Sequence, residues 1–313
     1  MKKITVNHVL SSNTKSIIFD DILGYHKKHS ESSIDIIVSI TPKSNSDVYV
    51  YHRPHLEEML RNNSIAIVHH DLREFEPCFN LSLFFPRYTE AGFVICLNRT
   101  QENILREKGL NNTVVIPHGY NPDVFKEIIA PKKHSEGKKV CLGILSKYYF
   151  RGVKGDVSIL EIAKRLPISD FSFFLVGEGR EILSKQLADL GFTSEFVENH
   201  SYSKFSVIYD KIDILLITSF YEGGPASVPE AIVTGTPIIT TPVGMALDYI
   251  SDGNNGVFLS GTYDDYAQLI IDSCKMCNLN KLFKQAFLSR YNVMTWSNVV
   301  NGYSEIYKRI LNV

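Results

Sequence analysis

The sequence predicts two α/β domains, each built on a parallel sheet that is covered by helices. The chain has 313 residues, more than one hydrophobic core usually serves. Short apolar runs rich in β-branched residues alternate with segments of helical spacing, which is typical of parallel sheets. A polar, basic stretch between Phe125 and Val140 interrupts this alternation. We therefore expect one domain on each side of a linker.

The first domain is expected to span residues 1–130 and to be Rossmann-like. Helices are predicted at His55–Arg61 and at Gln101–Lys108, the second of which follows a cap at 98–100 and ends at Gly109. The predicted strands are Ile4–Val9, Ile34–Ile40, Val48–Tyr51, Ile65–His69, Phe93–Leu97 and Val114–Pro117.

The second domain, residues 137–295, is expected to repeat this architecture. Its predicted strands are Val140–Leu145, Phe171–Val176, Glu195–Glu198, Ile212–Thr218, Thr236–Thr240 and Gly256–Leu259. Its predicted helices are Val157–Arg165, Glu181–Leu190, Tyr202–Tyr209, 226–235, Asp264–Cys277 and Lys281–Ser289. A last helix is expected over Thr295–Leu311, which contains the only tryptophan, Trp296.

Composition favours a globular enzyme of the cytoplasm. The chain is 44% apolar and has a formal net charge of −1, which gives no reason to expect a nucleic-acid partner. Five cysteines, an odd number, suit a reducing compartment better than a disulfide framework. The pair Cys274 and Cys277 lies in a helical pattern, so zinc is not expected there. We expect neither a secretory leader nor a membrane span.

Short basic stretches leave peripheral contact with the inner face of a membrane open as an alternative. They are His26-Lys27-Lys28-His29, Lys132-Lys133-His134 and Lys138-Lys139. Such runs could favour an anionic surface or a phosphorylated acceptor, but they are more often solvated loops.

The segment 219–244, SFYEGGPASVPEAIVTGTPIITTPVG, places two glutamates eight positions apart around a Gly-Gly-Pro turn. A strand is expected before the turn and a helix after it. The first N–H groups of a helix lack internal partners and its dipole is positive at that end, so a phosphate is favoured there. Glu222, before the turn, and Glu230, inside the helix, could hold two separate sets of hydroxyls.

Glu222, Glu230 and the following Gly235-Thr236-Pro237 resemble the signature of retaining glycosyltransferase family 4, which has the GT-B fold. The resemblance implies two Rossmann-like domains that face each other across a cleft, with a C-terminal helix, 296–313, crossing back to the first. It assigns Glu222 to the donor sugar and Glu230 to the ribose hydroxyls. The donor-binding turn between them consists of Gly223, Gly224 and Pro225.

The same resemblance implies cations for the leaving diphosphate, whose negative charge grows as the sugar–oxygen bond breaks. Lys154, followed by Gly155, resembles the lysine-glycine step whose lysine binds the pyrophosphate. Its upstream partner is Lys147 or Arg151. Lys147 lies nearer the family spacing and would act as a point charge, whereas Arg151 would offer a bidentate fork. The turn Gly177-Glu178-Gly179 resembles the strand-end turn beside the nucleotide.

In the first domain, His69-His70-Asp71 follows a strand and resembles the family's His-Asp loop, which faces the donor sugar. We favour His70, because it directly precedes Asp71 and a histidine can donate or shuttle protons near neutral pH. His118 and Gly119 resemble the Pro-Asn-Gly turn near the domain junction, and His118 is expected to be structural.

One departure keeps other interpretations open. The family's Gly-Gly loop after the first strand is missing, and Ser11, Ser12 and Asn13 stand in its place. A second hypothesis is therefore a catalytically degenerate GT-B protein that acts as a partner subunit of a glycan-assembly complex. A third is a GT-B enzyme with another chemistry, such as an epimerase or a phosphorylase, although phosphorylases need a much longer chain.

The predicted function is transfer of a sugar from a UDP or GDP donor to a hydroxyl of a glycan or lipid-linked acceptor, with retention, in surface polysaccharide or glycoconjugate synthesis. The catalytic residues are expected to be Lys154, Glu222 and His70. No cofactor is expected besides the donor substrate. No metal is expected either, because the family resembled uses protein cations and a helix terminus for the diphosphate. The base, donor sugar, linkage and oligomeric state stay open.

Overall fold

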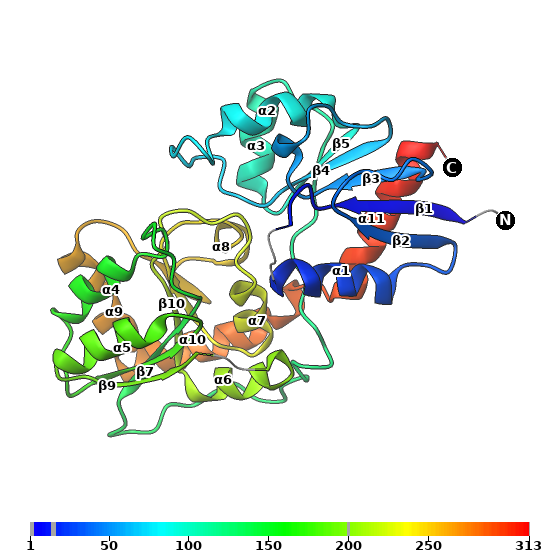
Figure 1. The fold of residues 1–313 in the computed structure, drawn as a ribbon. Coiled ribbons are helices and arrows are strands. Elements are labelled where there is room, and N and C mark those ends of the chain that lie inside the picture. The colour runs from blue at the N-terminus through cyan, green and yellow to red at the C-terminus, as the bar shows by residue number, and fades with distance from the viewer. Residues whose placement is uncertain (1–2, 14–16, 199–200, 313) are drawn as a thin grey trace. The chain divides into compact units, whose positions relative to one another are not determined.

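The computed structural model describes residues 3–13, 17–198 and 201–312, and the chain divides into two compact units (Figure 1). The first unit consists of Met1–Gly119, Glu222–Gly224 and Met294–Val313, and the second of Tyr120–Tyr221 and Pro225–Val293. Each unit is a parallel α/β sheet with its helices. No helix of the described residues is long and apolar enough to cross a membrane.

The described strands of the first unit are parallel and have the order β2-β1-β3-β4-β5-β6. Their ends lie within two residues of the predicted ends. Each strand is rich in β-branched residues, and its central side chains are buried: Val6, Val50 and Val94 are fully buried. The strands are β1 (Ile4–Val9), β2 (Ile34–Ser39), β3 (Val48–Tyr51), β4 (Ser64–Val68), β5 (Phe93–Cys96) and β6 (Thr113–Val115).

The helices of the first unit differ from the prediction in three places. Helix α1 (Ile17–His29) was not predicted, and the stretch 26–29 is its last turn rather than a solvated loop. Helix α2 (Leu81–Glu90) was also missed, and Pro86 lies inside it. The helix predicted at His55–Arg61 is only a 3₁₀ turn, η1 (Pro54–Leu56). Helix α3 (Arg99–Glu107) is confirmed, with Asn98 as its cap.

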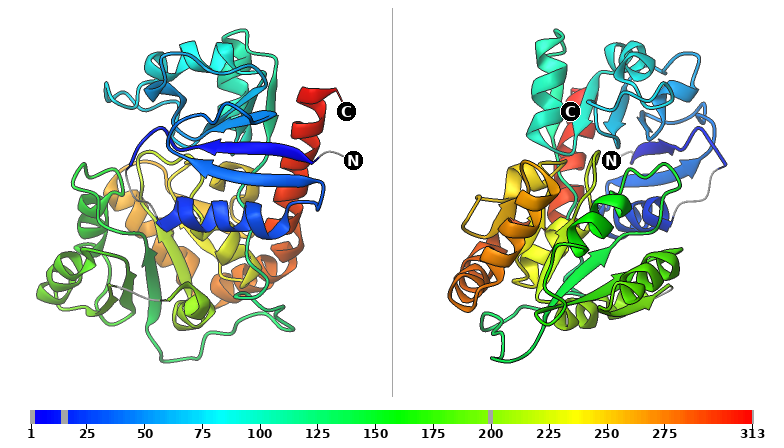
Figure 2. Two further views of the ribbon diagram at one scale, coloured as in Figure 1. Left: turned by 45° about the vertical axis from the view of Figure 1, so that its right-hand side comes forward. Right: turned by 90° about the vertical axis from the view of Figure 1, so that its left-hand side faces the viewer.

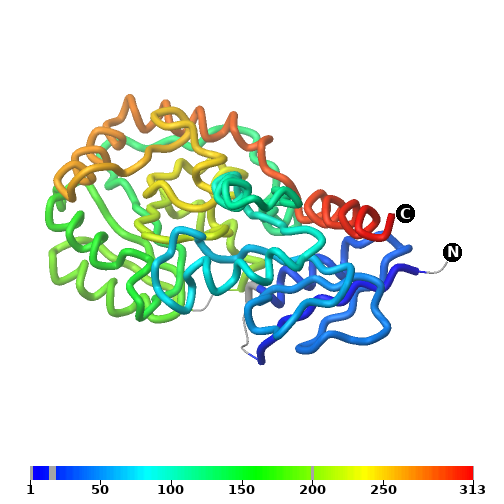
Figure 3. Tube along the Cα trace, turned by 90° about the horizontal axis from the view of Figure 1, so that it is seen from above, coloured from blue at the N-terminus to red at the C-terminus, as the bar shows by residue number. Residues whose placement is uncertain are grey.

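The C-terminal helix α11 (Trp296–Leu311) belongs to the first unit, as predicted. It packs against α1 and β3, and its red ribbon runs beside the blue strands in both views of Figure 2. Figure 3 shows its end close to the start of β1. The Trp296 ring stacks on Tyr25 with 4.8 Å between ring centroids. A Cβ on Gly119 would lie 2.8 Å from the backbone of Thr295, so this crossing requires glycine.

The described strands of the second unit are also parallel, in the order β12-β11-β10-β7-β8-β9. Successive residues enter different hydrophobic clusters: Leu216 packs in one cluster, whereas Leu215 and Ile217 pack in another. This alternation shows that both faces of the sheet are covered. The strands are β7 (Val140–Leu145), β8 (Phe171–Val176), β9 (Thr193–Val197), β10 (Ile214–Ile217), β11 (Ile238–Thr240) and β12 (Gly256–Phe258).

Three predicted helices of the second unit are wrong in their bounds, and α8 (Ala246–Tyr249) was not predicted. The helix expected at Lys281–Ser289 begins at Met276, and the one expected at Tyr202–Tyr209 starts as a 3₁₀ turn and continues to Lys211. The segment Asp264–Cys277 is interrupted at Lys275, whose extended backbone (φ −57°, ψ 136°) ends α9 and begins α10. The helices of the unit are α4 (Asp156–Ala163), α5 (Arg180–Asp189), α6 (Phe205–Lys211), α7 (Ser227–Val233), α8 (Ala246–Tyr249), α9 (Tyr263–Cys274) and α10 (Met276–Ser289), with 3₁₀ turns η2 (Tyr202–Lys204) and η3 (Arg290–Asn292).

Candidate active site

In the second unit, the strand order reverses at the centre of the sheet. β8 and β9 lie on one side of β7, and β10, β11 and β12 lie on the other. Ligands of open α/β sheets bind outside the carboxyl ends of the strands at such a switch point. The loops that follow β7 and β10 meet there, because the Thr218 hydroxyl donates to the carbonyl of Lys154 (3.0 Å) and the Phe220 N–H donates to that of Val153 (2.9 Å).

Lys147 and Lys154 come together on one aromatic ring of the first of these loops. Their Nζ atoms lie 5.0 Å and 5.4 Å from the ring centroid of Tyr149. Lys147 is exposed and Lys154 is half-buried. Attraction to the ring holds ammonium groups in place, and two positive charges gathered around one ring favour an anionic ligand. Arg151, the other predicted candidate, lies in the same loop, and burial lowers its pKa.

The glycines of the predicted motifs permit close backbone packing. Gly155 has φ +72°, and a Cβ there would lie 2.0 Å from the carbonyl oxygen of Thr218. Gly177 has φ +138°, and its Cβ would lie 2.7 Å from the amide nitrogen of Lys147. Both positions therefore demand glycine. The Glu178 side chain is exposed, and its carbonyl accepts the N–H of Tyr148 (2.8 Å). Gly177 and Glu178 thus hold the lysine-bearing loop through the backbone.

Sequence reasoning missed Arg180, which is fully buried in the second unit. Its guanidinium donates to the carbonyl and the hydroxyl of Ser146 and to the carbonyl of Lys147 (3.2 Å). It also pairs with Asp156, the first residue of α4. Arg180 therefore ties the start of the loop that carries Lys147 to the helix that follows Lys154. Nothing in the sequence indicated this role, because an arginine directly after Gly179 is typical of an ordinary helix start.

Glu230 lies on α7 and is 4% exposed. Its two carboxylate oxygens accept hydrogen bonds from the hydroxyls of Tyr202 (to Oε1, 2.8 Å) and Tyr209 (to Oε2, 2.9 Å). Burial and the carboxylate raise the pKa of Tyr209 well above its ordinary value, so this hydroxyl stays a donor. The site thus presents a buried carboxylate that already binds hydroxyl groups. Pro225, the last residue of the predicted turn, belongs to this unit and precedes α7.

The turn Glu222–Gly224 belongs to the first unit, where it lies against the ends of β4 and β5. The Glu222 N–H points to Oδ2 of Asp71 (3.4 Å), and the Asn98 side chain donates to the carbonyl of Gly223 (2.8 Å). A Cβ on Gly223 would lie 2.3 Å from the His69 carbonyl, and one on Gly224 would lie 2.7 Å from Leu97. Close approach of the backbone therefore requires glycine at 223, whereas a side chain at 224 would displace Leu97.

His70 is held from two sides in the first unit. Its ring stacks on Phe84 at 3.8 Å between centroids, and its carbonyl accepts a hydrogen bond from the Gln101 side chain (2.8 Å). Burial, with a smaller contribution from His55, lowers the pKa of His70 to about 4, although Asp71 opposes the shift. His70 is therefore neutral at pH 7, and its Nε2 is buried without a partner among the described residues.

Four further residues of the predicted motifs lie in the first unit. His118 is 7% exposed, hydrogen-bonds to the backbone of Gly224 and packs on Trp296. Burial lowers its pKa to about 4. Ser11, in the segment that replaces the Gly-Gly loop, has φ +56°, a left-handed conformation that glycine adopts more easily. Ser12 and Asn13 follow it, and residues 14–16 lie outside the described residues.

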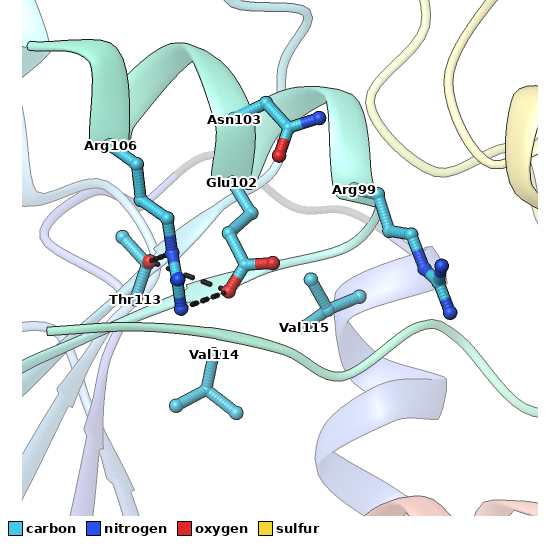
Figure 4. Close-up of a pocket in the computed structure, with 7 residues that line it drawn as sticks. All are labelled: Arg99, Glu102, Asn103, Arg106, Thr113, Val114 and Val115. Atoms are coloured by element: carbon cyan, nitrogen blue, oxygen red, sulfur yellow. Dashed lines mark hydrogen bonds and ion pairs between the residues drawn. The ribbon is translucent and has the colours of Figure 1, made fainter. Parts of the chain in front are cut away.

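A hollow of about 630 Å³ on the first unit is not the predicted site (Figure 4). Arg106 in its wall pairs with Glu102 (2.9 Å) and donates to the Thr113 hydroxyl (3.0 Å), so these charges satisfy one another. The predicted donor residues are absent from its lining, which consists of Arg99, Glu102, Asn103, Arg106, Thr113, Val114 and Val115.

A family model described as glycosyl transferases group 1 matches residues 124–286, which is more than half of the chain. The chain belongs to this family. The match covers the loops with Lys147 and Lys154, the turn at Gly177 and both glutamates.

Two curated relatives of this group 1 glycosyltransferase come from Methanocaldococcus jannaschii. The uncharacterized glycosyltransferase MJ1069 is 24% identical over 240 residues, and the uncharacterized glycosyltransferase MJ1178 is 24% identical over 235 residues. Each alignment covers 72% of this chain. The chain spans 60% and 63% of the lengths of these relatives.

Two solved structures of similar fold align with almost the whole length of this group 1 glycosyltransferase. Sucrose-phosphate synthase from Thermosynechococcus elongatus has a TM-score of 0.76 at 14% identity, with 99% of this chain and 100% of that chain covered. Anabaena Alr3699/HepE in complex with UDP and glucose has a TM-score of 0.71 at 13% identity, with 96% and 98% covered. The predicted GT-B fold is confirmed by these likenesses and by the two parallel sheets.

Proposed function

We propose that this group 1 glycosyltransferase is a retaining enzyme of family 4 that transfers a sugar, a hexose in our proposal, from a nucleoside-diphosphate donor to a hydroxyl acceptor. The pair Lys147 and Lys154, fixed over the Tyr149 ring, carries the proposal. A leaving diphosphate gains negative charge as its bond to the anomeric carbon breaks, and fixed cations stabilise that charge. This choice takes Lys147 rather than Arg151 as the partner of Lys154.

Glu230 supports a nucleotide donor. Its carboxylate already accepts hydrogen bonds from two hydroxyls, which is the interaction that the ribose hydroxyls would make. The fold neighbour HepE was solved with UDP-glucose, so UDP is the first base to test and GDP the second. Helix α7 has seven residues, so we assign the diphosphate to the lysines rather than to the start of this helix.

The proposed reaction is a front-face displacement. The bond from the anomeric carbon to the diphosphate oxygen breaks while the acceptor oxygen forms its bond on the same face, and the departing phosphate accepts the acceptor's proton. Glu222 contacts the donor sugar, and His70, neutral at pH 7, lines the acceptor side. Catalysis then consists of positioning and of leaving-group stabilisation. The lysines supply the positive charge, so we propose that no metal and no cofactor are needed.

The acceptor in this proposal is a glycan or a lipid-linked glycan, and the setting is surface polysaccharide or glycoconjugate synthesis in the cytoplasm. Peripheral contact with the inner face of the membrane is the corresponding proposal for a lipid-linked acceptor. Lys132, in one of the basic stretches, does not serve such a contact, because its ammonium donates to the backbone carbonyls of Tyr209 and Ile212.

The test is a screen of sugar nucleotides for binding and for slow hydrolysis without acceptor, in the presence of a chelator. We expect one donor to bind and to be hydrolysed. Lys154→Met should reduce hydrolysis about 100-fold, the order found when a group that stabilises developing charge is removed. The matched control is Lys164→Met, because Lys164 is an exposed lysine that pairs with Glu161 on the surface of the same unit.

Two outcomes would contradict the proposal. If no nucleoside diphosphate or sugar nucleotide binds, the degenerate partner subunit becomes the better interpretation, and the replacement of the Gly-Gly loop by Ser11, Ser12 and Asn13 favours that alternative. If Lys154→Met and Lys164→Met behave alike, the lysine pair does not serve the leaving group. An inverted anomeric product would refute retention alone.

A further inference from the structure

A chain of buried hydrogen bonds links four histidines and one tyrosine in the first unit. The Tyr307 hydroxyl lies 3.3 Å from Nε2 of His8 and 3.5 Å from Nδ1 of His26. Nδ1 of His8 lies 3.0 Å from Nε2 of His52, and Nδ1 of His52 lies 3.1 Å from Nε2 of His69. The order of the chain is therefore His26, Tyr307, His8, His52, His69.

The chain crosses the sheet at its switch point. His8 lies near the end of β1, His52 directly follows β3 and His69 directly follows β4, and these strands are neighbours in the sheet. The order of the sheet reverses between β1 and β3, with β2 on the far side of β1. His26 and Tyr307 approach this edge from α1 and α11. The parallel strands thus bring the rings together at the edge where such folds bind ligands.

The arrangement is a linear chain rather than a metal site. His52 uses its two ring nitrogens for two different neighbours, so its nitrogens do not converge with theirs on one point. Among the described residues, no group of three or more candidate ligands could hold a metal ion. Each nitrogen–nitrogen separation of 3.0–3.1 Å accommodates one proton.

All four histidines are neutral in the folded chain. Burial is the largest cause and lowers the pKa of His26 and of His52 to about 3, and the pKa values of His8 and His69 well below the ordinary value. The groups that face His69 disfavour its protonation as well: they are His52, His118, His70 and the Arg53 guanidinium, while the Phe19 ring of α1 packs on it at 4.8 Å.

A neutral imidazole donates from one nitrogen and accepts at the other, so the position of one proton fixes all the others along the chain. His26, at the inner end of the hydrogen-bonded chain, decides in which direction the protons are donated. Nε2 of His26 is buried without a partner among the described residues, and an orphaned N–H is rarer in proteins than an orphaned acceptor. His26 therefore keeps its proton on Nδ1 and donates to Tyr307, which donates to Nε2 of His8.

The same rule fixes the proton positions of the remaining histidines as far as His69, at the outer end. Nδ1 of His8 donates to His52, and Nδ1 of His52 donates to Nε2 of His69, which leaves the proton of His69 on its own Nδ1. No described residue bonds to this Nδ1, and His69 is half-buried. The backbone of His69 touches Gly223, next to Glu222, so the ring stands beside the turn that we assign to the donor sugar.

We propose that the chain from His26 to His52 is a positioning relay that holds His69 as a neutral Nδ1–H donor for a sugar hydroxyl or an acceptor oxygen beside Glu222. His69, rather than His70 alone, then contacts the ligand. The contact with a sugar rests on the proposed glycosyl transfer, whereas the tautomer of His69 does not depend on any ligand.

The test is the ring-nitrogen NMR spectrum of the full chain labelled with ¹⁵N-histidine, at pH 7 and without ligand. We expect His69, assigned by its loss in His69→Gln, to be neutral with the proton on Nδ1. The relay would be overturned if His69 is doubly protonated or carries its proton on Nε2. It would also be overturned if metal analysis finds zinc bound to the protein and the ring-nitrogen signals of His69 are those of a zinc ligand.

Tyr307→Phe tests whether the tautomer of His69 depends on the distant links of the hydrogen-bonded histidine chain. This change removes one buried oxygen three hydrogen bonds away from His69, so the Nε2–H form of His69 should gain population. Tyr303→Phe is the matched control, because Tyr303 is buried on the same helix and packs edge-on against His26, but its hydroxyl is not a link of the chain. Equal spectra for the two variants would refute the remote coupling.

His52→Phe breaks the last link and keeps an aromatic ring against Phe19. We expect His69 to shift towards the Nε2–H form, and donor hydrolysis to lose about tenfold in turnover, the scale of one hydrogen bond, with unchanged affinity for the nucleoside diphosphate. Equal loss in turnover and affinity would contradict a positioning role. If the wild-type protein binds no sugar nucleotide, the proposed function fails, while the NMR result still decides the relay.

Discussion

At the residue scale, Glu230 is occupied by side chains of its own chain. Tyr209 is fully buried, and its hydroxyl, which donates to Glu230, also lies 3.2 Å from the carbonyl oxygen of Ser227, so it is a fixed part of the core. Tyr202 is half-buried, lies in the short turn η2 and packs against the rings of Phe205 and Phe125. Because Glu230 is 4% exposed, we expect a ribose hydroxyl that binds Oε1 to take the place of the Tyr202 hydroxyl.

Tyr202→Phe should therefore tighten the binding of a nucleoside diphosphate. The ribose no longer competes with an internal donor, and a hydrogen bond to a charged group contributes on the order of 1.5 kcal/mol, so we expect roughly tenfold tighter binding by calorimetry. The gain should disappear with a nucleotide that lacks both ribose hydroxyls. Weaker binding would show that Tyr202 positions Glu230 instead of covering it.

Glu230→Gln tests the ribose contact by changing the acceptor itself rather than the competing donor. The amide keeps the size of the side chain but offers one acceptor oxygen in place of two, so it cannot serve Tyr209 and the ribose equally. We expect nucleotide affinity to fall about tenfold or more. The matched control is Glu178→Gln, because Glu178 has an exposed side chain and contributes its backbone carbonyl. Unchanged affinity in Glu230→Gln would remove the ribose role.

At the scale of elements, Arg180 joins the end of β7, the start of α4 and the start of α5. Its side chain is fully buried, and its charge is paired with Asp156 and with oxygens of Ser146 and Lys147. A buried ion pair is not in itself evidence of stability, but the loss of one partner leaves the other charge uncompensated. The position of Lys147 and Lys154 thus depends on one residue outside the predicted motifs.

Arg180→Met should destabilise the second unit by about 3–5 kcal/mol, because Asp156 and three loop oxygens lose their partner. Hydrogen exchange of the strands β7 and β8 measures this loss. Arg165→Met is the control: Arg165 is exposed and pairs with Glu161 and Asp264 on the surface, where solvent screens the charges and little loss of stability is expected. Similar protection in both variants would show that Arg180 does not stabilise the loop.

The sequence predicted the strands better than the helices, for a physical reason. A buried parallel strand is a short β-branched run, and such runs are visible in one dimension. Helix α1 was missed because its buried stripe contains His26, which a hydrophobic pattern counts as polar. In the site, motif residues were found because the turns need glycine, whereas Arg180, Asn98 and Gln101 act through contacts between distant segments.

At the scale of the whole molecule, histidines with lowered pKa gather in one unit. Within the described residues, seven histidines of the first unit have a pKa lowered by burial: His8, His26, His52, His55, His69, His70 and His118. The two units should therefore respond differently to acid. The only tryptophan, Trp296, belongs to the first unit and packs on Tyr25, so its fluorescence reports the unfolding of that unit.

The first unit should lose stability as the pH falls below about 6.5. In that range the unfolded chain binds protons at histidines that stay neutral when folded, down to about pH 3 for His26 and His52 and about pH 4 for His70 and His118. The unfolded state thus holds more protons, and the free energy of unfolding rises with pH, by up to about 1.4 kcal/mol per pH unit for each histidine.

His26→Leu provides the quantitative form of this prediction. One histidine fewer should reduce the slope of unfolding free energy against pH by about 1.4 kcal/mol per pH unit between pH 5 and 6, measured by urea unfolding followed through Trp296. Ile22→Ala, at a buried position of the same helix that does not titrate, should lower stability at every pH and leave the slope unchanged. If His26→Leu keeps the wild-type slope, His26 is protonated in the folded chain, which would also remove the end that sets the direction of the histidine relay.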